Sequence, residues 1–135
     1  MNARELARRS QAAVAAKDRG AWLGLFADDA IVQDPIGPSP LDPSGAGHRG
    51  ATAIAAFYDT VIATAERITF EIERSYLCGD EVADVGEIRT VLPGGRQVAV
   101  VHGVFTYRSN GDGQLAGMRA FWEFEKAELI PAEQD

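Results

Sequence analysis

Four consecutive stretches in the second half of the chain carry apolar residues at every second position, and they constrain its fold most strongly. From Ile68 onward these stretches read ITFEIERSYL, EVADVGEIRTVL, RQVAVVHGVFTYRS and QLAGMRAFWEFEK. A two-residue period is typical of a β-strand with one buried face. The breaks between them are turn-forming: Cys78-Gly79-Asp80, Pro93-Gly94-Gly95 and Asn110-Gly111-Asp112-Gly113. The sequence therefore predicts four strands joined by short loops, in an antiparallel meander.

Helical spacing dominates the first half of the chain instead. Residues 3–17 favour helix, with small apolar side chains along one stripe. Asp18 can cap a second short helix, which is expected to run through Phe26 and to end at residues 27–29. Residues 51–66 form the clearest helix of the chain. Helices followed by antiparallel strands predict an α+β fold, with the helices packed on one face of a sheet.

Size and composition narrow the class of protein. With 135 residues the chain is long enough for about one domain, and we expect a single domain over residues 1–135. The net charge of −7, without a large basic cluster, makes nucleic acid and anionic membranes poor candidates as partners. The one cysteine, Cys78, excludes an internal disulfide framework and a sulfur-rich metal site. Neither a signal-peptide core nor a bilayer-spanning stretch is present, so a cytoplasmic location is expected.

Asp34 stands at the end of a short apolar strand pattern, AIVQDPIG. At a period of two, Ala30, Val32 and Asp34 share one face, and Pro35 ends the regular pairing. A carboxyl group that faces an apolar interior is costly to ionise, so its pKa should rise toward the range that a general base needs. The alternative is an ordinary surface turn, because Asp-Pro steps are common in turns. From these residues alone both interpretations stay open.

The segment that follows, residues 37–50, reads GPSPLDPSGAGHRG and is predicted to be an irregular loop. It is long enough to act as a lid or rim of a site. His48 lies within it, and a lone His in such a loop is more often solvated than catalytic. No second His lies near it in the sequence, so a metal site is not expected.

Several motifs taken together resemble one family. VQDPIG, the Gly-rich loop, GATAIAAFYD and NGDGQLAGMRAFW follow one another in the order of the ketosteroid isomerase family, within the nuclear transport factor 2-like (SnoaL-like) superfamily. The resemblance implies a cone-shaped α+β fold, with a curved antiparallel sheet packed on three N-terminal helices and one deep apolar pocket. It also implies a possible homodimer through the outer sheet face, where Phe121 is expected by alternation.

The resemblance assigns catalytic roles residue by residue. Asp34 takes the position of the general base that moves a proton between two carbons of an enone, without a cofactor. The family's two oxyanion donors, a Tyr on the first helix and a protonated Asp on a late strand, correspond to Ser10 and Gly103. Reduced isomerase activity is therefore expected. Tyr58 matches a supporting Tyr and could reach the substrate oxygen directly or through a water held by Ser10; alternatively, its hydroxyl meets solvent or backbone.

The remaining candidates would bind a ligand mainly through apolar contacts. The odd-numbered residues of 101–107 share one strand face by alternation and include Tyr107, whereas His102 points away. For each residue alone, core packing is the simpler role. As a group around Asp34 they indicate a bulky, planar, weakly polar ligand, steroid-like or polyketide-like. The candidate substrate-binding residues are Ser10, Phe57, Val101, Gly103, Phe105, Met118 and Trp122.

Three functions stay open from the sequence. The first is cofactor-free proton transfer by Asp34 next to a carbonyl. The second is a SnoaL-like cyclisation or dehydration of a polyketide- or terpenoid-type substrate. The third is binding of steroids or similar lipids without catalysis, which the missing donors favour. Epoxide opening is disfavoured, because Asp84 and Glu87 lie on opposite faces of one strand and at most one of these carboxylates faces inward.

Overall fold

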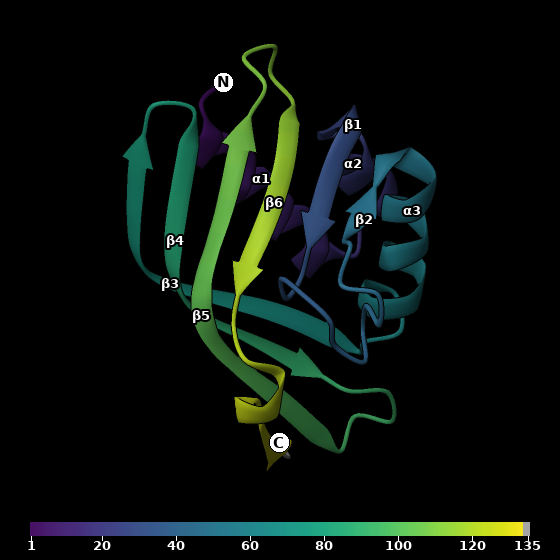
Figure 1. The fold of residues 1–135 in the computed structure, drawn as a ribbon. Coiled ribbons are helices and arrows are strands. Elements are labelled where there is room, and N and C mark those ends of the chain that lie inside the picture. The colour runs from purple at the N-terminus through teal and green to yellow at the C-terminus, as the bar shows by residue number, and fades with distance from the viewer. Residues whose placement is uncertain (134–135) are drawn as a thin grey trace.

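A computed structural model describes residues 1–133 and shows a curved mixed sheet with helices on one side (Figure 1). The helical elements are α1 (Ala3–Ala16), α2 (Arg19–Leu23), α3 (Gly50–Phe57), the π-helical turn η1 (Tyr58–Ile62) and the 3-10 turn η2 (Phe124–Lys126). The strands are β1 (Phe26–Gln33), β2 (His48–Arg49), β3 (Arg67–Cys78), β4 (Glu81–Val91), β5 (Gln97–Ser109), β6 (Leu115–Phe121) and β7 (Glu128–Pro131). No helix within residues 1–133 is long and apolar enough to cross a membrane.

The strand order is β2-β1-β6-β5-β4-β3, with β7 paired to β5 (Figure 1). Strands β3 to β6 pair with their sequence neighbours in antiparallel fashion, which confirms the predicted meander. Strand β1 joins the sheet in parallel to β6, with Val32 opposite Met118. The first strand in the chain is therefore hydrogen-bonded to the last long one.

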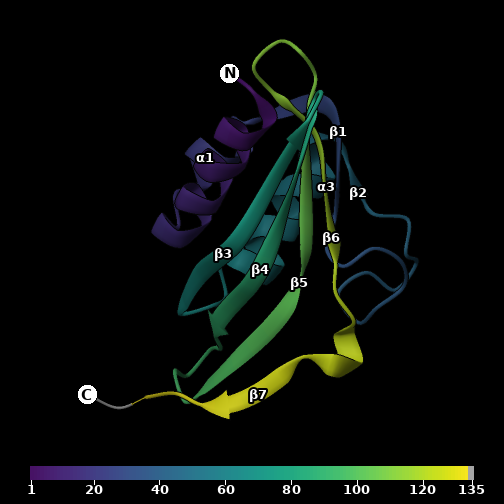
Figure 2. The ribbon, with the colours of Figure 1, turned by 90° about the vertical axis from the view of Figure 1, so that its left-hand side faces the viewer.

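The sheet curls around its helical side (Figure 2). Helix α1 lies on one face of the sheet, and the lower ends of β3 and β5, together with β7, bend toward that same side. Buried apolar side chains from both layers form one core. The α+β cone expected from the sequence is confirmed.

Two glycines that face each other across β4 and β5 let the sheet bend. Gly86 is opposite Gly103, and β3 has a register shift between Ile72 and Arg74 beside them. A Cβ at Gly86 would lie 2.0 Å from the carbonyl oxygen of Glu71, and one at Gly103 would lie 2.2 Å from that of Phe121. Neighbouring backbone therefore occupies the space of a side chain at both positions.

Three element boundaries predicted from the sequence were wrong. Phe26 and residues 27–29 are strand rather than helix end, because Phe26 pairs with Leu115 of β6. The predicted helix 51–66 ends as an α-helix at Phe57 and continues as a π-helical turn. The last predicted strand stops at Phe121, and the chain turns back through η2 so that β7 pairs with the half of β5 that β6 leaves free. Each difference comes from long-range pairing or packing, which local periodicity does not contain.

The glycine pair gives a testable prediction for stability. Gly86→Ala or Gly103→Ala should lower the free energy of unfolding by about 1–3 kcal/mol, because the added methyl group forces backbone apart. Gly20→Ala is the matched control: nothing lies within 4 Å of a Cβ there, so that variant should be neutral or more stable by up to about 1 kcal/mol. Denaturant titration measures all three, and equal effects would contradict a role for the pair in the bend.

Candidate active site

A cavity of about 480 Å³ lies between the concave face of the sheet and the helices. This volume is typical of a site for a small organic ligand. Its walls are mainly aliphatic and aromatic, and they come from α1, α3, η1 and every long strand. The C-terminal segment contributes Phe124, Ala127 and Leu129, which the sequence did not indicate. The polar side chains on the wall include Ser10, Asp34, Tyr107 and three threonines.

Asp34 faces this cavity from the position directly after β1. The indole Nε1 of Trp122 donates a hydrogen bond to Asp34 Oδ1 at 2.7 Å. No side chain of residues 1–133 donates to the other carboxylate oxygen, Oδ2. Burial raises the pKa of Asp34, while the Trp122 hydrogen bond and, to a smaller extent, the neighbouring His48 oppose that rise. The geometry presents one fixed and one free carboxylate oxygen to an apolar space.

The turn after β1 is held against β6. The amide of Ile36 donates to the carbonyl of Ala120 at 3.1 Å, two residues before Trp122. Asp34 and Trp122 are therefore brought together by the parallel β1–β6 pairing, although they are far apart in the sequence.

Tyr107 is a cavity residue that sequence reasoning did not assign to the site. Its side chain is 1% exposed, and it lines the cavity from β5. Gln11 Nε2 lies 3.5 Å from the phenol oxygen and donates to Asp84 Oδ2 at 2.9 Å. Burial is the main cause that raises the pKa of Tyr107, so the phenol stays protonated. Strand alternation had placed Tyr107 on the inward face, but nothing in the sequence showed which inward residues meet empty space.

The structure brings six of the predicted site residues together on the cavity wall. These are Ser10, Asp34, Phe57, Val101, Met118 and Trp122. Ser10 is buried, and its Oγ accepts a hydrogen bond from Trp22 Nε1 at 3.0 Å. All six residues line the same cavity. Their roles in catalysis or ligand binding stay predictions.

Three other predicted site residues do not line the cavity. Gly103 faces the carbonyl of Phe121 instead, as described above. Phe105 is fully buried beside Ala120 of β6 and packs within the core. Tyr58 is 3% exposed, and its ring centroid lies 5.6 Å from that of Trp22. Tyr58 therefore does not line the cavity, contrary to the expectation that it faces the ligand. The π-helical turn places its ring against Trp22 of α2, within the buried core.

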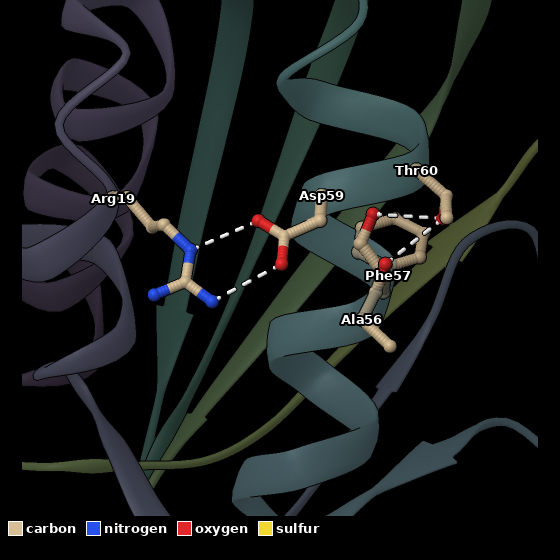
Figure 3. Close-up of polar contacts among 5 residues, drawn as sticks. All are labelled: Arg19, Ala56, Phe57, Asp59 and Thr60. Atoms are coloured by element: carbon tan, nitrogen blue, oxygen red, sulfur yellow. Dashed lines mark hydrogen bonds and ion pairs between the residues drawn. The ribbon is translucent and has the colours of Figure 1, made fainter.

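The segment around Tyr58 is anchored to α2 by an ion pair (Figure 3). Arg19 Nε and Nη2 donate to the two carboxylate oxygens of Asp59 at 2.9 and 3.1 Å. In the same turn, the hydroxyl of Thr60 donates to the carbonyl of Ala56 at 2.9 Å. The ion pair joins the turn that follows Phe57, a cavity residue, to α2, and the Thr60 hydrogen bond lies within the helical segment itself.

His48 differs from the expectation of a solvated loop residue. It lies on β2 opposite Val32, and its ring centroid is 4.9 Å from that of Phe57. Its Nε2 atom is buried and has no hydrogen-bond partner within residues 1–133. The short β1–β2 pairing places it there, and no local signal in the sequence predicts that pairing. In the same described range, no group of three or more His, Cys, Asp or Glu could hold a metal ion.

The outer face of the sheet carries the residue expected at a dimer contact. Phe121 is 47% exposed, and the guanidinium carbon of Arg119 lies 5.5 Å from its ring centroid. The exposed position agrees with strand alternation, and dimerisation itself stays a prediction.

The chain is similar in sequence and fold to several known proteins. A family model described as a SnoaL-like domain matches residues 7–123. The crystal structure of Rv0760c from Mycobacterium tuberculosis is 37% identical with a TM-score of 0.89, covering 95% of this chain and 96% of that one. The Δ5-3-ketosteroid isomerase from Mycobacterium sp. is 36% identical with a TM-score of 0.89, covering 95% and 98%.

A second structure of the Mycobacterium tuberculosis protein was solved in complex with estradiol-17β-hemisuccinate. It is 38% identical with a TM-score of 0.86, covering 93% of this chain and 97% of that one. No curated protein sequence matches the chain. The family model and these structures cover almost the same residues as the motifs identified in the sequence. The chain therefore belongs to the SnoaL-like, ketosteroid isomerase-like proteins of the nuclear transport factor 2-like superfamily.

Proposed function

We propose that this protein is a cofactor-independent isomerase that moves a carbon-bound proton next to a carbonyl group, with Asp34 as the general base. The observation that carries the proposal is the free Oδ2 of Asp34 in an apolar cavity of about 480 Å³. A steroid-like ketone is the proposed substrate. The similarity to a ketosteroid isomerase at 36% identity supports this choice.

The proton moves between two carbons without a change in oxidation state. Asp34 Oδ2 removes a proton from the carbon beside the carbonyl, and the C–H electron pair moves to form an enolate. The resulting carboxylic acid then returns the proton to a carbon further along the conjugated system, and the carbonyl re-forms. Trp122 keeps Oδ1 occupied throughout, so that Oδ2 is the oxygen that exchanges the proton.

The two positions that carry oxyanion donors in the ketosteroid isomerase family hold Ser10 and Gly103 in this chain. Ser10 lines the cavity with a short hydroxyl, and Gly103 has no side chain. Loss of one such donor typically lowers the rate by about 10²–10³. With these two replacements, we expect a slow isomerase.

A binding protein for steroid-like ligands is the second candidate function. The complex of a 38% identical relative with estradiol-17β-hemisuccinate supports it. The apolar walls of the cavity suit both candidates equally, so only turnover separates them. A SnoaL-like cyclase or dehydratase would use the same Asp34 on a different substrate.

The first test replaces the proposed base. Asp34→Asn should lower the turnover of a 5-ene-3-ketosteroid by about 10²–10⁴, while steroid affinity stays within a few-fold, because only proton transfer is lost. Asp28→Asn is the matched control, since that carboxylate is exposed on the same strand. The appearance of the conjugated enone in the ultraviolet measures turnover.

Stability should change in the opposite sense to activity. Folding raises the pKa of Asp34, so this group disfavours the folded state fully at pH values above the folded pKa, and the penalty disappears as the pH falls from there to the lower pKa of the unfolded chain. Asp34→Asn should therefore melt at the same temperature as the wild type or higher at neutral pH.

Steroid binding without turnover in both the wild type and Asp34→Asn would contradict the isomerase and support the binding protein.

The pH profile tests the environment of the base. Because Asp34 must be ionised to act, kcat/KM should fall as the pH is lowered through its raised pKa. Trp122→Phe removes a hydrogen bond that favours the carboxylate, so the inflection should move to higher pH. Phe121→Leu, on the outer face, should leave the inflection in place. An unchanged inflection in Trp122→Phe would contradict the assignment of Asp34 as the titrating base.

A further inference from the structure

Tyr107 lines the cavity, and its phenol proton has no acceptor among residues 1–133. The phenol oxygen lies 3.5 Å from Gln11 Nε2, which donates toward it. No group within residues 1–133 accepts a hydrogen bond from the phenol O–H. The oxygen of such a buried phenol already accepts a hydrogen bond. Its O–H group can therefore still donate a hydrogen bond to a bound molecule.

The buried carboxylate of Asp84 holds Gln11 in place as a hydrogen-bond donor to Tyr107. Asp84 is 3% exposed, and its Oδ2 accepts from Gln11 Nε2 at 2.9 Å. An amide –NH₂ has two hydrogens, so Gln11 can serve the Asp84 carboxylate with one and the phenol oxygen with the other. This arrangement orients Gln11 as a donor to Tyr107 and prevents its amide oxygen from taking the phenol proton.

Tyr107 and Asp34 lie on the same concave surface. Val32, Met118 and Tyr107 form one row across β1, β6 and β5, and all three line the cavity. Asp34 is two residues beyond Val32 on the same face. Two strand spacings separate the β1 and β5 backbones by about 10 Å. Because the sheet curves, the two side chains approach the same enclosed space from different strands.

We infer that Tyr107 donates the hydrogen bond to the ligand's oxygen, and that the ligand is a rigid apolar molecule with a carbonyl group at the end that α1 covers. The inference rests on the proposed function, in which Tyr107 is a catalytic residue: its O–H stabilises the enolate oxygen as Asp34 takes the carbon-bound proton. A donor from β5 thus lines the same cavity as Ser10, whose own side chain is short.

The experiment compares the three tyrosines of the chain. Tyr107→Phe removes only the hydroxyl and should lower kcat on a 5-ene-3-ketosteroid by about 10²–10³. Tyr58→Phe tests the competing assignment and should have little effect. Tyr76→Phe is the neutral control, because Tyr76 is 54% exposed on β3. Thermal melting of each variant checks that the fold is kept.

A binding measurement gives a readout that does not need turnover. Testosterone has a 4-ene-3-ketone whose ultraviolet band shifts to longer wavelength when its oxygen accepts a hydrogen bond. Wild-type protein should produce this shift, and Tyr107→Phe should abolish it and weaken binding by about tenfold. The wild type should also bind testosterone about tenfold more tightly than the 3-deoxy analogue, a comparison that requires no variant.

The outcomes separate this inference from the proposed function. If the wild type turns over the ketosteroid and Tyr107→Phe keeps both its rate and the band shift, the inference is overturned and the isomerase stands. If the band shift depends on Tyr107 but the wild type shows no turnover, the donor role is supported and the isomerase fails. Equal affinity for testosterone and its 3-deoxy analogue, or no binding of either, overturns the inference.

Discussion

Parallel pairing of β1 with β6 is the constraint on which the site depends. It joins the first third of the chain to its end and places Val32 opposite Met118. On the other side of Met118, β5 places Tyr107 in the same row. Without it, the carboxylate of Asp34 would have no indole beside it, and the cavity would lack one wall. The curvature of the sheet, which the close backbone contacts at Gly86 and Gly103 accommodate, completes the enclosure (Figure 2).

The site combines an apolar wall with few polar groups, and two of these groups, Asp34 and Tyr107, have unused hydrogen-bonding capacity within residues 1–133. Asp34 has one bonded and one free oxygen, so burial outweighs the Trp122 hydrogen bond and its pKa rises. Tyr107 accepts a hydrogen bond from Gln11 and donates none to residues 1–133. Unfilled hydrogen-bonding capacity at a cavity wall is costly for folding and useful for a ligand. Because these two residues lower the stability of the fold without a ligand, we propose that they are kept for binding one.

Much of the fold and part of the site could be predicted from local pattern. The two-residue period after Ile68 predicted the meander, and the VQDPIG stretch placed Asp34 at the end of an apolar strand face. Tyr58 and Tyr107 could not be ranked in this way. Both are buried tyrosines in good core positions, and the difference is that a π-helical turn packs one on Trp22 while the other meets empty space.

By itself, the sequence determined the order and type of the long elements, since hydrophobic period and turn residues are properties of neighbouring positions. It also determined the family, through motifs spread over nearly the whole chain. Only the tertiary structure decided the partners: Trp122 for Asp34, Gln11 for Tyr107 and Val32 for His48. These contacts join residues far apart in the chain, and their geometry follows from sheet register and curvature, which no local pattern encodes.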